Sequence, residues 1–173
     1  MKLVIRPENL EDKEAIHAVV QRAFQSLAEP LLVDRLRQEN AAALSLVAEA
    51  DRKIVGYILF SPMTLGPATF EQRVFGLAPL AVLPEYQKQG IGSKLVRRGL
   101  SMGISSGWKR VFVLGSPAYY SRFGFKKASD YNYFSEYEVP DETFMVVSLD
   151  SVEMAVGQAY LAQYHPLFKE LSV

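Results

Sequence analysis

The chain has 173 residues, of which 49% are hydrophobic and 22% charged, a composition typical of a folded globular protein and unlike that of a disordered chain. Lysine plus arginine and aspartate plus glutamate both number 19, so the chain lacks the basic excess of most nucleic-acid-binding proteins. It contains no cysteine, which excludes disulfides, thiolate metal sites and a cysteine nucleophile. We assign no metal site and expect no nucleic-acid partner.

The opening residues, Met1–Pro7, lack the apolar core of a signal peptide. No run along the chain approaches the roughly 18 apolar residues of a membrane span. We therefore expect a cytoplasmic protein that does not contact the membrane. The length suits one domain, which we predict over residues 1–173, with a core at about residues 3–149 and a C-terminal extension at 150–173.

The first elements are a strand and two helices. Lys2–Arg6 is predicted as a short strand, and Asn9, with Asp12 three residues on, is a plausible helix N-cap with an acidic capping partner. A second helix is predicted over Glu29–Gln38, with Leu31, Leu32 and Leu36 facing inward. The inward face of the first helix recurs at helical spacing and comprises Ile16, Val19, Val20, Ala23 and Phe24.

The period then changes to that of strands. Three segments rich in Val, Leu, Ile, Phe and Tyr, namely Ala42–Ala50, Lys53–Met63 and Phe70–Val82, are predicted as strands. The polar connection Asp51–Lys53 predicts an antiparallel hairpin, and Gly66-Pro67 marks the next turn.

A helix between two strands follows. Ile91–Ser105 shows an apolar sector at helical period, and Arg110–Leu114 after it is predicted as a buried strand, so this region forms one parallel βαβ crossover. The expected apolar sector comprises Ile91, Leu95, Val96, Gly99, Leu100, Met102, Gly103 and Ile104. A short helix at Pro117–Phe123 and strands at Tyr133–Val139 and Thr143–Leu149 complete the predicted elements, whereas the residues after Asp150 show no pattern that we assign. The fold class is α/β, with a central, mostly antiparallel mixed sheet, one parallel crossover and flanking helices.

The stretch Pro84–Leu95, which leads into this helix and includes its first turn, has the composition of an anion site. A Walker phosphate loop is excluded because Lys94 lies two residues beyond Gly92, and a dinucleotide fingerprint is excluded because Leu95 occupies the third glycine position. Glycines let a diphosphate approach the N–H groups at a helix start. A glycine-containing turn without a ligand is the alternative interpretation.

Two motifs resemble those of the GNAT superfamily of N-acetyltransferases. The first is a strand ending in Leu80-Ala81-Val82-Leu83-Pro84, followed by Gln87-x-x-Gly90-x-Gly92, and the second is Tyr120-x-x-x-Gly124-Phe125. Ile5-Arg6-Pro7 also resembles the family's beginning, and the resemblance covers about residues 3–149. Leu114–Phe125 and the tail motif Tyr164-His165-Pro166-x-Phe168 are similar to a small bacterial-type subgroup of undefined acceptor, which has Asp where Ser116 stands.

The resemblance implies a GNAT-like fold and acetyl-CoA as cosubstrate. The loop would cradle the coenzyme A diphosphate mainly through backbone N–H groups, and the strand end would pair with the pantetheine arm. Ser116 is expected either to orient a water or cofactor group or to cap the short helix. The residues assigned to cofactor binding are Leu80, Ala81, Val82, Gln87, Lys88, Gln89, Gly90, Ile91, Gly92, Ser93 and Ser116.

The resemblance also implies a catalytic role for Tyr120, as a proton or hydrogen-bond donor to the departing thiolate. The base stays open among Glu49, Glu71, His17 and water. Because the chain has no cysteine, we expect direct transfer in a ternary complex rather than through an acetyl-cysteine.

The implied function is acetyl transfer from acetyl-CoA to a primary amine of a small molecule or a protein. Two groups are candidates for the acceptor pocket: Phe24, Leu27, Glu29 and Leu32, and the late aromatic residues Tyr131, Tyr133, Phe134 and Tyr137. The alternative is a non-catalytic acyl-CoA sensor or partner-binding module on the same fold. The oligomeric state is open, with a homodimer among the options.

Overall fold

The protein is described from a computed structural model, which covers residues 1–173 except 69–71, 155, 172 and 173. The chain packs as two compact units. The first comprises Met1–Ser61, Ala78–Gly99 and Pro166–Val173, and the second Pro62–Leu77 and Leu100–His165. The assignment of residues 1–173 to one domain stays a prediction.

The first unit is built on strands in the order β1, β2, β3 and β5. They are β1 (Leu3–Pro7), β2 (Leu44–Ala50), β3 (Lys53–Pro62) and the part of β5 (Val74–Val82) that begins at Ala78. β1 pairs antiparallel with β2, and β2 pairs antiparallel with β3, which confirms the predicted hairpin. Asp51 and Arg52 both have positive φ, as a two-residue type I′ hairpin turn requires.

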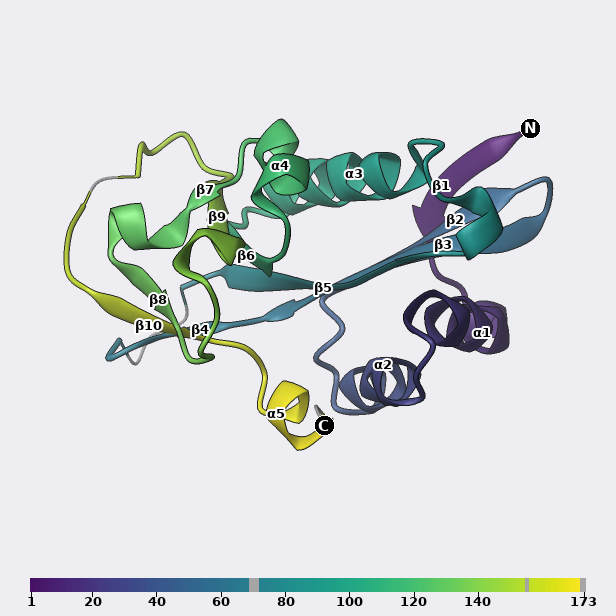
Figure 1. Ribbon diagram of the computed structural model, residues 1–173, viewed down its shortest axis with the longest axis horizontal. Helices are drawn as coiled ribbons and strands as arrows, with labels where there is room; N and C mark the ends of the chain where they lie inside the picture. Colours follow the sequence, from purple (N-terminus) through teal and green to yellow (C-terminus); the bar gives the residue numbers. More distant parts are fainter. Residues whose placement is uncertain (69–71, 155, 172–173) are drawn as a thin grey trace. The chain divides into compact units, whose positions relative to one another are not determined.

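Helices cover both faces of this sheet (Figure 1). Those of the first unit are η1 (Leu10–Asp12), α1 (Lys13–Phe24), α2 (Ala28–Gln38), η2 (Pro84–Tyr86), the start of α3 (Ile91–Ser105) and α5 (Leu167–Leu171), which packs against α2. Gly56 on β3 lies close to Leu95 and Ile91 of α3, and the missing Cβ of Gly99 leaves room for the ring of Phe60. Because α1 and α2 lie on the other face, Val55–Ser61 is buried throughout.

An ion-pair network joins β1 to the start of α1. Asp12 accepts hydrogen bonds from Arg6 at 2.7 and 3.1 Å, and from the backbone N–H of Asn9 at 2.7 Å. Arg6 therefore holds the pKa of Asp12 below its usual range. Asp12 is the acidic capping partner that the sequence predicted.

The second unit carries the rest of the strands. They are the Val74–Leu77 part of β5 with β6 (Arg110–Leu114), β9 (Phe144–Ser148) and β7 (Lys126–Lys127), and a separate small sheet of β4 (Thr64–Gly66), β10 (Tyr160–Gln163) and β8 (Tyr133–Ser135). Short helices connect them: α4 (Pro117–Tyr120), η3 (Ser121–Phe123), η4 (Ala128–Tyr131) and η5 (Asp141–Thr143). β5 and β6 are parallel, whereas β6 and β9 are antiparallel.

The predicted fold class is confirmed, with one parallel β5–α3–β6 crossover in a mixed sheet that is otherwise mainly antiparallel.

Three residues that were predicted to face inward are exposed: Leu31 (47%), Ile104 (56%) and Phe24 (40%). The third predicted strand begins at Val74, and its residues 70 and 71 lie outside the described part of the chain. β10 and α5 lie in the tail, where the sequence predicted no element.

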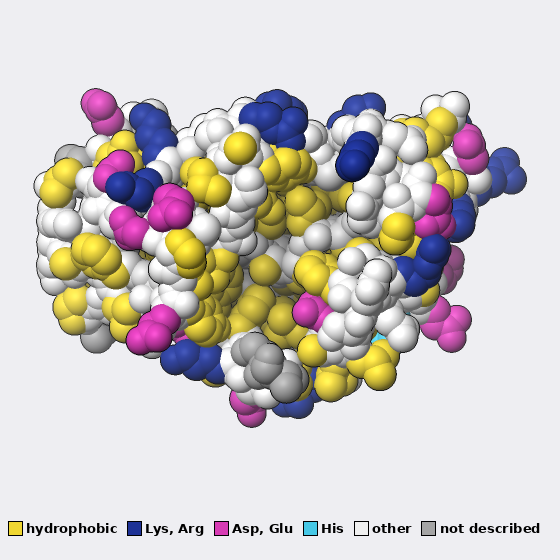
Figure 2. Space-filling model, in the orientation of Figure 1, with side chains coloured by type: hydrophobic (Ala, Val, Ile, Leu, Met, Phe, Trp, Pro, Cys, Tyr) yellow, Lys and Arg dark blue, Asp and Glu magenta, His cyan; other side chains and the backbone are white. Residues whose placement is uncertain are grey.

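Both signs of charge occur across the face drawn in Figure 2, as the equal totals of basic and acidic residues lead one to expect. Within the described part of the chain, no helix is long and apolar enough to cross a membrane. Among the same residues, no three His, Cys, Asp or Glu side chains gather as metal ligands would.

Candidate functional site

The loop between β5 and α3 lies in the first unit and is open to solvent. Gln87, Lys88, Gln89 and Gly90 are all exposed. Lys88 (φ 61°) and Gly90 (φ 82°) have left-handed backbone conformations, and a Cβ at Gly90 would meet no atom within 4 Å. Turns of this kind direct successive N–H groups toward one point. The loop leads into the N-terminus of a 15-residue helix, where the helix dipole also favours an anion.

Two glutamine side chains hold this loop in place. Gln87 Nε2 donates to the carbonyl of Val82 at 3.0 Å, and Gln89 Nε2 donates to the carbonyl of Glu85 at 3.3 Å. Because these amides bind the protein's own backbone, the loop is left to offer mainly backbone N–H groups to a ligand. The Val82 carbonyl, at the end of the strand expected to pair with pantetheine, already accepts one hydrogen bond.

The predicted residues before and after the loop are less exposed. On β5, Ala81 is buried, and Leu80 and Val82 are half-buried. At the start of α3, Ile91 is buried, and Gly92 and Ser93 are half-buried. All of them share the first unit with the loop, whereas Ser116 and Tyr120 belong to the second.

The acidic residue beside the loop is neutralised by an arginine. Arg22 at the end of α1 donates two hydrogen bonds to the Glu85 carboxylate, at 2.8 and 2.9 Å. This pairing lowers the pKa of Glu85 and raises that of Arg22. Lys88 and Lys94 then add positive charge near the helix start. The sequence carries no local signal for this ion pair, because its partners are 63 residues apart.

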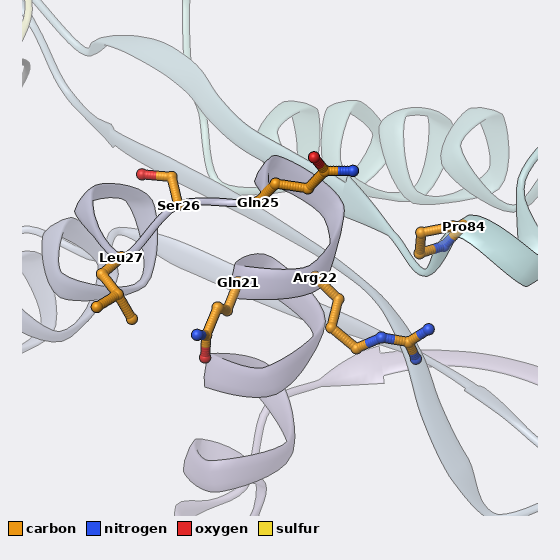
Figure 3. A pocket seen from close by; sticks show the side chains of 6 residues that line it. All are labelled: Gln21, Arg22, Gln25, Ser26, Leu27 and Pro84. Carbon is orange, nitrogen blue, oxygen red and sulfur yellow. The ribbon is translucent and has the colours of Figure 1, made fainter.

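A cavity of about 720 Å³ lies beside this ion pair (Figure 3). It is lined by residues from the end of α1, from its connection to α2, and from the turn after β5: Gln21, Arg22, Gln25, Ser26, Leu27 and Pro84. Of the acceptor candidates in this region, Leu27 lines the cavity, whereas Phe24, Glu29 and Leu32 do not. Glu29 Oε2 is buried and has no hydrogen-bond partner among the described residues.

Tyr120 lies in the second unit, on the short helix after β6. Ser116 caps this helix, since its Oγ accepts the Tyr119 N–H at 3.4 Å, which is the capping role considered from the sequence. The Tyr120 ring packs edge-on against Phe125, with centroids 5.6 Å apart, and against Gly115, where a Cβ would collide with it. Tyr120 is 9% exposed, and burial raises its pKa above the ordinary value. Its phenol is therefore protonated at neutral pH.

The late aromatic residues Tyr133, Phe134 and Tyr137 have different surroundings. Tyr133 packs edge-on against Phe112 at 5.2 Å, and Phe134 beside it on β8 is exposed, because neighbouring strand residues face opposite sides. Tyr137 lies 6.3 Å from the ring of Tyr164. Burial, with Glu136 adding to it, raises the pKa of Tyr137 to about 12.

Two candidate bases are engaged elsewhere in the first unit. Glu49 accepts hydrogen bonds from Arg6 at 2.9 and 3.0 Å, and His17 Nδ1 lies 3.4 Å from Asp34 Oδ2. The third candidate, Glu71, lies outside the described residues. The geometry therefore does not favour Glu49 or His17 as the general base.

Comparison with known proteins agrees with the two motifs. The model of the acetyltransferase (GNAT) family matches residues 13–125. Escherichia coli (strain K12) YhbS, described as an uncharacterized N-acetyltransferase, is 36% identical over 96% of this chain and 98% of its own. The YhbS crystal structure with coenzyme A has a TM-score of 0.92, at 34% identity, and covers 100% of this chain and 95% of that one. A Brucella melitensis GNAT acetyltransferase with acetyl-CoA has a TM-score of 0.80, at 34% identity, and covers 96% and 98%. The chain belongs to the GNAT acetyltransferase family.

Proposed function

We propose that the protein transfers the acetyl group of acetyl-CoA to a primary amine, and that the loop Gln87–Ser93 binds the coenzyme A diphosphate. The observation that carries this proposal is the exposed loop at the N-terminus of α3, with positive φ at Lys88 and Gly90. A diphosphate needs converging N–H donors and positive charge. The loop offers both, and the Arg22–Glu85 pair offsets the nearby acid.

The backbone at the end of β5, Leu80–Val82, is proposed to pair with the pantetheine arm, as an added strand would. Acetyl-CoA supplies an activated acyl thioester when it is bound. The sequence contains no cysteine, so an acetylated thiol cannot form on the protein. The proposed transfer is therefore direct, from the thioester to the amine.

Tyr120 is proposed as a hydrogen-bond donor to the sulfur that leaves. A free thiol has a pKa of about 8.5, and that of Tyr120 is raised above about 10, so complete proton transfer to the thiolate would run uphill. The buried phenol keeps its proton at Oη and stabilises the developing charge by donating a hydrogen bond to it. Donors of this kind act strongly in a low-dielectric site.

For the acceptor we propose the region around the α1–α2 connection. The cavity there is lined by polar side chains, including Gln25 and Ser26, and by the apolar Leu27. The buried Glu29 Oε2, at the start of α2, adds an acceptor that a cationic amine would satisfy. Water is the proposed proton acceptor from the attacking amine, since Glu49 and His17 already have charged neighbours.

The experiment is thiol release from acetyl-CoA with a panel of diamines, amino sugars, amino acids and peptide amino groups. Because the chain has no cysteine, a thiol reagent reports released coenzyme A without background from the protein. Calorimetric titration with coenzyme A is run in parallel. Turnover with one amine supports the proposal. Binding without turnover for any amine favours an acyl-CoA sensor, and no binding at all excludes both.

A further inference from the structure

Tyr164, in the tail after β10, is buried in the second unit. It is 7% exposed although it lies 44 residues beyond Tyr120, in a segment where the sequence predicted no element. The proposed chemistry does not use it. A buried tyrosine normally has a partner for its hydroxyl and a specific surface for its ring.

The hydroxyl of Tyr164 accepts a hydrogen bond from the backbone N–H of Leu114, the last residue of β6. The neighbouring Gly115 N–H donates to Thr143, on the side of β9. Because successive N–H groups of a strand point to opposite sides, the Leu114 N–H points away from β9, toward the side on which β6 pairs with β5. The described β5–β6 pairing ends with Gly76 opposite Phe112. Tyr164 therefore satisfies a donor just past that pairing.

The ring of Tyr164 is held by a glycine. A Cβ at Gly76 on β5 would lie 2.5 Å from Cε1 of Tyr164, a distance that no side chain can occupy. Tyr164 consequently packs against the backbone of β5 with its ring and binds β6 with its hydroxyl.

The same hydroxyl lies within electrostatic range of Tyr120, since negative charge on Tyr120 would raise the pKa of Tyr164. The backbone runs from Leu114 through Gly115 and the capping residue Ser116 to Tyr120, and the Tyr120 ring packs on Gly115. A displacement of Leu114 would thus move the segment that carries the Tyr120 ring.

We infer that Tyr164 is a positioning residue for Tyr120: its hydroxyl fixes the end of β6 and, through it, the orientation of the Tyr120 phenol. This inference rests on the proposed acetyl transfer and deepens it. It gives the part of the C-terminal extension that carries Tyr164 a role in the catalytic site of the second unit.

The test is Tyr164→Phe, which keeps the ring and removes the hydroxyl. Loss of one neutral hydrogen bond predicts a fall in kcat of about fivefold to tenfold, with the KM for acetyl-CoA unchanged within about twofold. The matched control is Tyr160→Phe, a half-buried tyrosine of β10 whose ring stacks on Tyr133 at 6.0 Å. The control should keep the wild-type kcat. Thermal unfolding of both variants shows that they are folded.

A double-mutant cycle separates positioning from a general structural role. In a Tyr120→Phe background, Tyr164→Phe should change kcat by less than about twofold, because the phenol that it orients is absent. The same fold loss in both backgrounds, or an unchanged kcat in Tyr164→Phe alone, overturns the inference while leaving the acetyltransferase in place. A wild-type protein that releases no thiol with any amine overturns the proposed function and this inference with it.

Discussion

The loop Gln87–Ser93 and the segment Gly115–Phe125 are built in opposite ways. The loop is exposed from Gln87 to Gly90, and its two glutamine side chains bind the protein's own backbone, which leaves mainly backbone N–H groups for a ligand. The tyrosine segment is packed against aromatic rings, and the function proposed for it depends on one buried hydroxyl, that of Tyr120. A site made of backbone should tolerate most side-chain changes and depend on φ. A site made of a side chain should depend on single atoms.

The largest expected effect is that of Tyr120→Phe. Removing one preorganised donor from a developing negative charge typically costs about 10²–10³ in kcat. We expect a loss of about 10²-fold, with coenzyme A affinity unchanged because the loop is intact. Steady-state kinetics and calorimetric titration measure the two quantities.

The adjacent Tyr119→Phe is the matched control. Its ring lies under the Arg122 guanidinium, 4.4 Å from it, and we assign it no role in catalysis. A Tyr120→Phe variant that retains more than about a third of the wild-type kcat, or a Tyr119→Phe variant with an equal loss, would contradict the assignment of the donor.

The second largest effect tests the backbone site. Gly90→Ala places a Cβ on a residue with φ 82°, where an L-residue costs about 1–2 kcal/mol. There is open space around that Cβ, so the strain acts on backbone conformation and not through a clash. We expect the loop to relax and the Kd for coenzyme A to rise about tenfold, with kcat at saturation nearly unchanged.

Gly107→Ala is the control for this strain. Gly107 has φ 77° in the turn after α3, so the alanine meets the same backbone penalty away from the loop. It should lower the melting temperature without changing the Kd. An equal Kd for both variants and the wild type would mean that the loop does not hold the diphosphate.

The two regions also differ in how far the sequence predicted them. Local signals define the loop: apolar residues at helical period predicted Ile91–Ser105 with its observed bounds, and glycines mark its entry. The same helical period gave wrong predictions of burial for side chains at the edge of an apolar face. Leu31 points away from the side of α2 on which Val33 and Leu36 are buried, and Ile104 falls at the margin of the α3 sector.

The residues that surround Tyr120 could not be predicted from the sequence. Tyr164 contacts Gly76 and Leu114, which lie far from it in the sequence. A local sequence pattern cannot predict such a contact. β10 is short, and its partners β4 and β8 lie far apart in sequence, so tertiary pairing rather than propensity defines it. The motif that begins at Tyr164 could be recognised in the sequence, but the contacts that Tyr164 makes could not be predicted from it.

A smaller effect should come from the charge beside the loop. Arg22→Ala leaves the exposed Glu85 carboxylate uncompensated near the proposed diphosphate site. Because both side chains are in solvent, we expect only about a threefold rise in the Kd for coenzyme A at low salt, vanishing at about 0.5 M salt. The double variant Arg22→Ala/Glu85→Gln should restore the wild-type Kd. If it binds as weakly as Arg22→Ala, the arginine acts by contact and not by neutralising Glu85.

The smallest expected effect is that of pH on kcat, which tests only the buried hydroxyl of Tyr120. A donor is active only below its pKa, and burial raises the pKa of Tyr120 above the ordinary value of about 10. Raising pH therefore removes no proton from Tyr120 within the range where the thioester survives. With saturating amine, kcat should show no decline between about pH 7 and pH 9.5, and deprotonation of the acceptor's ammonium can only raise it. A descending alkaline limb in the wild type that disappears in Tyr120→Phe would mean that the phenol ionises early. The tyrosine region would then be as open to solvent as the loop, and the contrast between a buried side-chain site and an exposed backbone site would not hold.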